Sequence, residues 1–207
     1  MSRGLALASL LLTACSGSST TTDAPLKRCP FGDASAPAQI EIVHLDESGL
    51  TVIDTLPGAE VPLNPPPQGG WILLLGVRAT NVDGCQMTLT TSFREPCSDA
   101  IVKLDQRPAK LEDLGNGWGR TTLGSFGNLP LCPQLSSQRN LHDEPYEVTV
   151  AVSDLDGKEA SKSITITPVC PAGADRCTCE CDRNYVVGGA CPPGGVDAGV
   201  PACDAGI

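Results

Sequence analysis

Two alternating segments near the end of the chain constrain its fold more than any other feature. Segment 146–153 places an apolar side chain at every second position, and segment 160–167 repeats this period through Ile164 and Ile166. A two-residue period is that of a β-strand with one buried face. Between the segments, residues 154–157 (Asp-Leu-Asp-Gly) have the composition of a tight turn. Together they predict an antiparallel hairpin in a fold built from half-buried strands.

Earlier segments extend this prediction. Segment 39–45 alternates in the same way, and segment 50–56 is interpreted as the second half of a split first strand. Segment 71–81 is a long apolar run, which predicts a core strand covered on both sides. Segment 87–93 predicts a half-buried strand. The remaining expectations are strands at 99–105 and 120–126, a connection at 62–70 and a long loop at 128–144.

Composition agrees with an all-β chain and excludes some partners. Aromatic residues make up 3%, and there are 22 glycines and 18 prolines, a balance that favours short strands joined by turns. The formal net charge is -10, and removal of the positively charged N-terminus would make the chain more acidic. Nucleic acid would be repelled, so no nucleic-acid partner is expected.

The closing hairpin carries a family resemblance. Residues 146–154, with Asp156-Gly157 and residues 163–167, resemble the last two strands of immunoglobulin-like and PKD-like bacterial surface domains. Tyr146 would then stand where such folds carry their corner tyrosine. The resemblance implies an immunoglobulin-like antiparallel β-sandwich of about 7–8 strands over residues 29–169. Most such sandwiches bind, space or anchor, which implies a non-catalytic module.

The N-terminus predicts where the protein resides. Arg3 precedes a short apolar run at residues 4–12, which reads as an export signal and is shorter than the about 20 residues that span a bilayer. Leu12-Thr13-Ala14-Cys15 resembles the lipobox of bacterial lipoproteins. That resemblance implies that residues 1–14 are a cleaved signal peptide and that Cys15 carries diacylglycerol and a further acyl chain such as palmitate.

The next segment predicts how the domain is attached. Residues 15–28 are rich in serine and threonine and lack an apolar pattern, as in a flexible tether. Inner-membrane lipoproteins usually carry aspartate after the lipidated cysteine, whereas this chain has Ser16. The resemblance therefore implies an outer-membrane lipoprotein, on the periplasmic face or the cell surface. Its partners would be the membrane and another envelope protein or surface polymer.

The cysteines predict a cross-linked tail. The chain has 11 cysteines, and lipidation of Cys15 leaves an even number for disulfides, as expected in an oxidising compartment. Residues 170–207 are rich in Cys, Gly and Pro, and are expected to form a small disulfide-rich tail. The alternative is a thiolate metal cluster at residues 177–181 (Cys-Thr-Cys-Glu-Cys), because Cys-x-Cys spacing can bring thiolates onto one soft ion.

The immunoglobulin-like topology implies a disulfide map. It places Cys29 and Cys85 at one end of the sandwich and Cys97 and Cys132 at the other, and a bridge needs Cα atoms within about 7 Å. The implied bridges are therefore Cys29–Cys85 and Cys97–Cys132. The tail cysteines are expected to pair among themselves: Cys170, Cys177, Cys179, Cys181, Cys191 and Cys203.

The same topology brings acidic loops together. Asp83, Asp154 and Asp156 would meet at one end, which makes a calcium- or metal-dependent binding domain the first alternative function. Asp and Gly also favour turns without any ion. Neither His44 nor His142 lies in a nucleophile or zinc motif, so the chain is not expected to be an enzyme, and an extracytoplasmic hydrolase is the second alternative.

Overall fold

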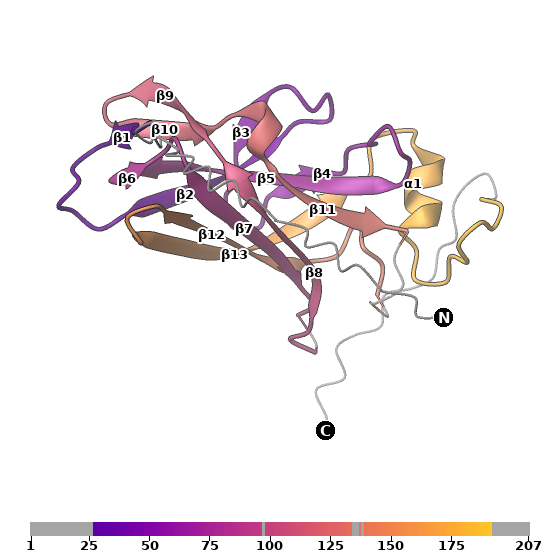
Figure 1. Ribbon diagram of the computed structural model, residues 1–207. Helices are drawn as coiled ribbons and strands as arrows, with labels where there is room; N and C mark the ends of the chain where they lie inside the picture. Colours follow the sequence, from indigo (N-terminus) through magenta and orange to yellow (C-terminus); the bar gives the residue numbers. More distant parts are fainter. Residues whose placement is uncertain (1–26, 97, 134–136, 138, 192–207) are drawn as a thin grey trace, which may run out of the picture.

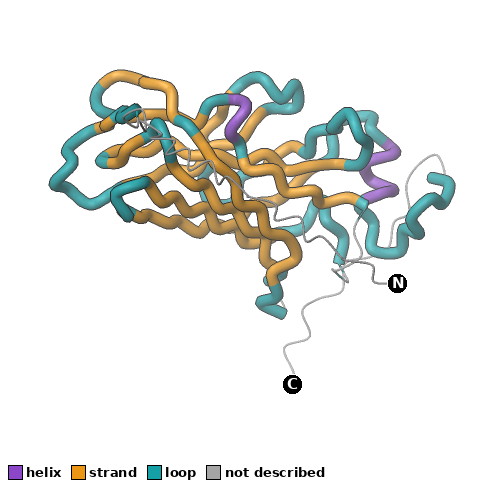
Figure 2. Tube along the Cα trace, in the orientation of Figure 1, coloured by secondary structure: helices purple, strands orange, loops and turns teal. Residues whose placement is uncertain are grey.

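The computed structural model describes residues 27–96, 98–133, 137 and 139–191. In this part of the chain, two β-sheets pack face to face, and the helical residues are confined to one short α-helix and one 3-10 turn (Figures 1 and 2). A third, two-stranded sheet pairs β1 (Pro30–Phe31) with β6 (Val82–Asp83). The predicted all-β sandwich is confirmed.

The first sheet is organised around β5, the apolar run predicted as the core strand. Its order is β3-β2-β5-β10-β9, and β11 also pairs with β5. Its strands are β2 (Gln39–Leu45), β3 (Val52–Asp54), β5 (Trp71–Thr80), β9 (Leu111–Gly115), β10 (Trp118–Thr121) and β11 (Gly127–Cys132). Strand β5 is buried along most of its length because it has neighbours on both edges and the second sheet beneath it.

The second sheet contains the predicted hairpin. Its order is β4-β13-β12-β7-β8, antiparallel throughout except that β4 runs parallel to β13. Its strands are β4 (Glu60–Pro62), β7 (Met87–Arg94), β8 (Ile101–Ala109), β12 (Tyr146–Asp154) and β13 (Glu159–Val169). Two such sheets, packed face to face with the closing hairpin inside one of them, form an immunoglobulin-like arrangement.

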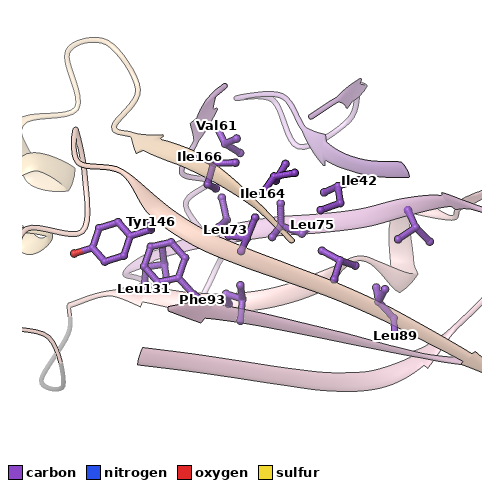
Figure 3. Packing of buried hydrophobic residues seen from close by; sticks show 14 of the residues in the cluster. Ile42, Val61, Leu73, Leu75, Leu89, Phe93, Leu131, Tyr146, Ile164 and Ile166 are labelled. Atoms are coloured by element: carbon purple, nitrogen blue, oxygen red, sulfur yellow. The ribbon is translucent and has the colours of Figure 1, made fainter. Parts of the chain in front are cut away.

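Tyr146 anchors the hairpin. It pairs with Ile166 across the two strands, is fully buried, and stacks on Phe93 with ring centroids 4.3 Å apart (Figure 3). Its hydroxyl donates a hydrogen bond of 2.6 Å to the backbone carbonyl of Asn140, six residues upstream. A corner tyrosine of an immunoglobulin-like sandwich makes a contact of this kind. Burial raises the pKa of the phenol above its usual range, so the hydroxyl stays a donor.

The core lies between the two sheets. Leu73 and Leu75 of β5 face Phe93 of β7 and Ile166 of β13, and all four side chains are fully or almost fully buried (Figure 3). Truncating one of these leucines to alanine would cost about 2–5 kcal/mol through lost transfer energy and the cavity left behind. The alternation read from the sequence is therefore the pattern that fills this core.

Four local expectations differ from the structure. Segment 50–56 is not the second half of the first strand, because β3 turns back and pairs antiparallel with β2. Segment 120–126 ends its strand at Thr121 and continues as a 3-10 turn, η1 (Leu123–Ser125). Segment 128–144 is not wholly a loop, because β11 pairs with β5 despite Pro130. No strand was predicted at β9, because four of its five residues are exposed and the segment lacks the apolar alternation of a half-buried strand.

Candidate functional sites at the two ends of the sandwich

Strand β5 runs between the two ends of the sandwich. Thr80 pairs with Gln39 and Trp118 at one end, whereas Trp71 pairs with Cys132 at the other. At about 3.3 Å per residue, the two ends of the strand are separated by about 30 Å. We call the first end the rim, formed by Arg28, Asp83, Asp154, Asp156 and Lys158. We call the second end the cap, formed by residues 170–191 with α1 (Asp175–Glu180).

At the rim, one arginine joins two of the predicted acidic residues. Arg28 Nη1 lies 3.2 Å from Asp83 Oδ2 and 2.7 Å from Asp156 Oδ2. The other oxygen of buried Asp83 accepts hydrogen bonds from the backbone N–H groups of Cys29 and Cys85, at 3.0 and 3.1 Å. Burial opposes ionisation of Asp83, but these donors and Arg28 outweigh it and lower the pKa of the carboxyl below its usual value.

The hairpin turn completes the rim. Asp154 Oδ2 accepts the backbone N–H of Asp83 at 3.0 Å, and its Oδ1 accepts the N–H groups of Asp156 and Lys158, both at 2.9 Å. The ammonium of Lys158 donates to the backbone carbonyl of Asn81 at 3.0 Å. The turn and the entering chain are thus tied together by charge-assisted hydrogen bonds.

The three predicted calcium ligands do come together, but they already have other partners. Both oxygens of Asp83 and of Asp154 accept hydrogen bonds, and the Arg28 guanidinium bridges Asp83 to Asp156. A calcium ion needs 6–8 oxygen ligands, so it would have to displace a cation and several N–H donors. As arranged, the rim is held by the two ion pairs of Arg28 and by hydrogen bonds that backbone N–H groups donate to its carboxylates.

The chain enters the sandwich through the rim disulfide. Cys29 is bonded to Cys85, the pair implied by the topology. Beside it, the ring of Phe31 lies against Gly84, where a Cβ atom would come within 2.4 Å of the ring. Gly119 of β10 is packed against the same ring, and a Cβ atom there would lie 2.9 Å from it. Glycine is required at both positions because the ring takes the space of a side chain.

The cap is covalently joined to the sandwich, which corrects the predicted disulfide map. Its three described disulfides are Cys132–Cys181, Cys170–Cys177 and Cys179–Cys191. The first contradicts both the Cys97–Cys132 pair and the expectation that tail cysteines pair only among themselves. The reason is that β11 and β13 both finish at the cap end, so the residues after β13 lie within reach of Cys132.

Some predicted sites cannot be compared with the structure. Cys15, Cys97 and Cys203 lie outside the described residues, as do residues 15–26 of the tether.

Polar side chains also fix the cap to the sheet. The indole N–H of Trp71 donates to Glu180 Oε2 at 3.1 Å, and Arg176 Nε donates to Glu180 Oε1 at 2.6 Å. Glu180 is buried, so its charge is balanced by these two donors rather than by solvent. The sequence could not have identified this pair, because Trp71 and Glu180 are far apart in the chain.

A buried ion pair supports the same end. Arg139 Nε donates to Glu144 Oε2 at 2.6 Å, and both side chains are less than 10% exposed. In the same segment, the backbone N–H of Leu141 donates to the carbonyl of Cys181 at 3.0 Å, and Asn140 Oδ1 accepts the N–H of Arg183 at 3.2 Å. Segment 139–144 therefore holds both the corner tyrosine and the cap.

The outer surface of the cap has features of a contact surface. Val186 is 74% exposed and Val187 is 57% exposed on the loop after α1. The same loop borders a shallow depression of about 600 Å³, which is lined by Asp175, Arg176, Glu180, Tyr185, Gly188, Gly189 and Cys191. Exposed apolar side chains beside an open depression are a common feature of surfaces at which macromolecules meet.

Both histidines lie within hydrogen-bonding distance of a polar side chain. His44 is buried, and its Nδ1 lies 2.9 Å from the Thr55 hydroxyl between β2 and β3. Burial lowers its pKa, and the nearby carboxylates of Asp46 and Asp54 offset this only in part. His142 Nδ1 lies 2.7 Å from Asp143 Oδ2, at the base of the cap.

The predicted Cys-x-Cys metal motif is divided between three disulfides. Cys177, Cys179 and Cys181 bond to three different partners, so they do not converge on one ion. In the described ranges, the only group of potential metal ligands that lie close together is Cys170, Cys177 and Cys181, and all of these are oxidised. The structure thus favours the disulfide interpretation over the thiolate cluster.

None of the helices in the described part of the chain has the length and apolar character needed to cross a membrane. No protein-family model matches the sequence, and no curated protein matches it significantly.

Proposed function

We propose that this protein is a lipid-anchored lipoprotein of the outer membrane whose non-catalytic β-sandwich presents the cap to another envelope component. The lipid anchor is Cys15 of the lipobox-like quartet. The protein is proposed to act by binding or spacing, through contacts between folded surfaces.

One observation carries this proposal: the chain enters the sandwich at the rim, and the cap occupies the opposite end. Arg28, at the start of the described chain, is bonded to rim residues Asp83 and Asp156. Residues 16–27 would span at most about 40 Å if fully extended. A flexible tether of this length has an r.m.s. span of only about 19 Å. A lipid at Cys15 would therefore hold the rim, on average, nearer to the membrane than the cap, which lies about 30 Å away along β5.

The proposal that the domain is non-catalytic is supported by the partners of its buried carboxylates. The buried carboxylates at the two ends are engaged by Arg28, Arg139, Trp71 or backbone N–H groups. A catalytic carboxylate or imidazole instead needs access to a substrate. The depression on the cap is open and shallow, as suits a contact between large surfaces.

The anchor is tested by labelling cells with a palmitate analogue and fractionating their membranes. We expect the wild-type protein to be labelled and recovered in the outer membrane, and Cys15→Ala to be unlabelled. The matched control is Ser16→Asp, which should still be labelled but should shift to the inner membrane. An unlabelled wild type recovered in the soluble fraction would overturn the proposal.

The role of the cap is tested by cross-linking on intact cells. The variant Val186→Asp/Val187→Asp places charges on the apolar tip, and Leu155→Asp makes the same change at an exposed rim position. We expect cross-linked adducts of the wild-type protein to be lost only in the cap variant. Loss of the adducts in the rim variant alone would show that the rim makes the contact and would overturn the proposed role of the cap.

A further inference from the structure

Two disulfides of the cap are in contact with each other. Cys177 Sγ lies 3.9 Å from Cys181 Sγ, yet Cys177 is bonded to Cys170 and Cys181 is bonded to Cys132. The sulfurs of Cys170, Cys177 and Cys181 all lie within 4.8 Å of one another. Such proximity matters because disulfides exchange when a thiolate attacks a neighbouring disulfide sulfur.

The two bridges differ in their exposure to solvent. Cys170 is half-buried, whereas Cys177 and Cys181 are fully buried and Cys132 is 4% exposed. A thiolate from solution can therefore reach the outer bridge, Cys170–Cys177, more easily than the inner bridge, Cys132–Cys181. The inner bridge is the one that joins the cap to β11.

We propose that the cap contains a thiol–disulfide exchange site at which an external thiolate attacks the outer bridge and thereby opens the inner one. The attacking reagent is a low-molecular-weight thiol or the active thiolate of an oxidoreductase. This exchange is additional to the anchoring and contact role proposed above and does not depend on it.

The exchange proceeds in two balanced steps. In the first, the external thiolate bonds to Cys170 Sγ, and the Cys170–Cys177 bond breaks to release Cys177 as a thiolate. In the second, the Cys177 thiolate bonds to Cys181 Sγ, and the Cys132–Cys181 bond breaks to release Cys132 as a thiolate. One thiolate is consumed and one is formed, and the number of disulfide bonds is unchanged, so neither step needs an oxidant. The proton lost by the external thiol is returned through solvent to Cys132.

The product has a different connection between cap and sandwich. Cys132 of β11 becomes free, and the new bridge joins Cys177 to Cys181, four residues apart at the end of α1. On a helix, Cβ atoms at this spacing lie about 5–6 Å apart, whereas a disulfide brings them to about 3.5–4.5 Å. The new bridge must therefore distort α1, so the exchanged form should accumulate only when Cys132 is trapped.

The test is a trapping experiment on the full-length protein in detergent. The protein is incubated with reduced glutathione, quenched with N-ethylmaleimide, and mapped as non-reduced peptides. Among molecules with one free thiol, we expect maleimide on Cys132, glutathione on Cys170, and a bridge between Cys177 and Cys181. Absence of that bridge, with maleimide on Cys177 instead, would overturn the proposal.

A variant separates the proposed exchange from simple destabilisation, because the exchange predicts slower release of Cys132 and destabilisation predicts faster release. In Cys170→Ser/Cys177→Ser the outer bridge is missing, so the attacking thiolate next to Cys181 is lost. We expect release of Cys132 to slow by about tenfold or more, because an intramolecular reagent acts at high effective concentration. Equal or faster release of Cys132 from a folded variant would contradict the proposed two-step exchange. If this variant does not fold, the wild-type peptide map alone decides the question.

The third cap bridge serves as the internal control. The Cys179–Cys191 bridge takes no part in the two-step exchange. The rate at which maleimide labels Cys191 should therefore be the same in the wild type and in Cys170→Ser/Cys177→Ser. A parallel slowing at Cys191 would show that the variant had altered general access to the cap.

Discussion

The rim and the cap use similar chemistry in different environments. At the rim, Arg28 and Asp156 are about half exposed and pair in contact with solvent. Next to the cap, in segment 139–144, Arg139 and Glu144 form their ion pair in the protein interior. Because screening weakens exposed pairs and burial makes an unpaired charge costly, the cap should tolerate substitution much less than the rim. The ion pair far from the proposed anchor should therefore be the more costly one to break.

The largest expected effect is removal of the bridge between cap and sandwich. Cys132→Ala/Cys181→Ala opens a loop with a sequence separation of 49 residues. The free energy of unfolding should fall by about 4 kcal/mol through the greater entropy of the unfolded chain. The control, Cys29→Ala/Cys85→Ala at the rim, should lose a similar amount. Denaturant unfolding measures both.

Hydrogen exchange separates the two disulfide variants. We expect faster exchange at the backbone amides of Leu141 and of position 181 only in the cap variant, because the Leu141 N–H donates to the carbonyl of residue 181 across the cap junction. Faster exchange in the rim variant should be confined to the neighbourhood of β1 and β6. The same set of exposed amides in both variants would break the distinction between the two ends.

The next effect compares the two ion pairs directly. Arg139→Leu leaves Glu144 buried without its partner, so the free energy of unfolding should fall by about 3 kcal/mol. The matched change at the rim, Arg28→Leu, should have a much smaller effect, since Arg28 and Asp156 are exposed to solvent. Urea unfolding of the two variants tests this, and an equal loss would remove the physical basis of the comparison.

A smaller effect is expected from the hydrogen bond between Trp71 and Glu180. Trp71→Phe keeps a ring in the core but removes the indole N–H, which should cost about 2 kcal/mol because the acceptor is a carboxylate. Tyr146→Phe removes a bond to a neutral carbonyl and should cost about 1 kcal/mol. Thermal unfolding at neutral pH provides the measurement. A larger loss for Tyr146→Phe would show that Glu180 contributes little to holding the cap.

Near neutral pH, the sensitivity of stability to pH should come from His44, which lies at neither end of the sandwich. Burial lowers the pKa of His44 in the folded state, so the unfolded chain takes up a proton that the folded chain resists. Stability should therefore fall as the pH drops through the unfolded value of 6.5, and level off below the folded pKa. Each pKa unit of difference is worth about 1.4 kcal/mol. Comparing urea midpoints at about pH 7.5 and pH 5.5 should show that His44→Gln flattens this response.

Calcium should have the smallest effect. Because Arg28 and backbone N–H groups already engage the rim carboxylates, adding calcium to chelator-treated protein should leave the melting temperature unchanged. The variant Arg28→Ala serves as the comparison, since it frees oxygens of Asp83 and Asp156. A calcium-dependent rise in the wild-type melting temperature would reopen the calcium-binding alternative.

Much of the fold could be read from local patterns, because half-buried strands repeat every two residues. This period located β12, β13 and β7, and the long apolar run located β5. It missed β11, since Pro130 interrupts the pattern of a strand that is nevertheless held by pairing with β5.

The sites were less predictable because they depend on which loops meet. The topology correctly brought Asp83 near Asp154, but nothing local to either residue indicated that Arg28 would bridge the acidic set. The Cys132–Cys181 bond is not indicated by the composition of the tail, because Cys132 lies on a strand 49 residues away in the sequence. Following β13 to its end would have placed Cys170 and the tail beside Cys132.

The most direct test of the account uses the two tryptophans of the chain. Trp118 lies at the rim beside Thr80, and Trp71 lies at the cap beside Glu180. The single-tryptophan variants Trp71→Phe and Trp118→Phe would be reconstituted by their lipid anchors into vesicles containing a dansyl-labelled lipid. Energy transfer to the membrane should be clearly stronger from Trp118 than from Trp71, because the rim is held at the bilayer. Equal transfer from both, or stronger transfer from Trp71, would contradict the proposed orientation.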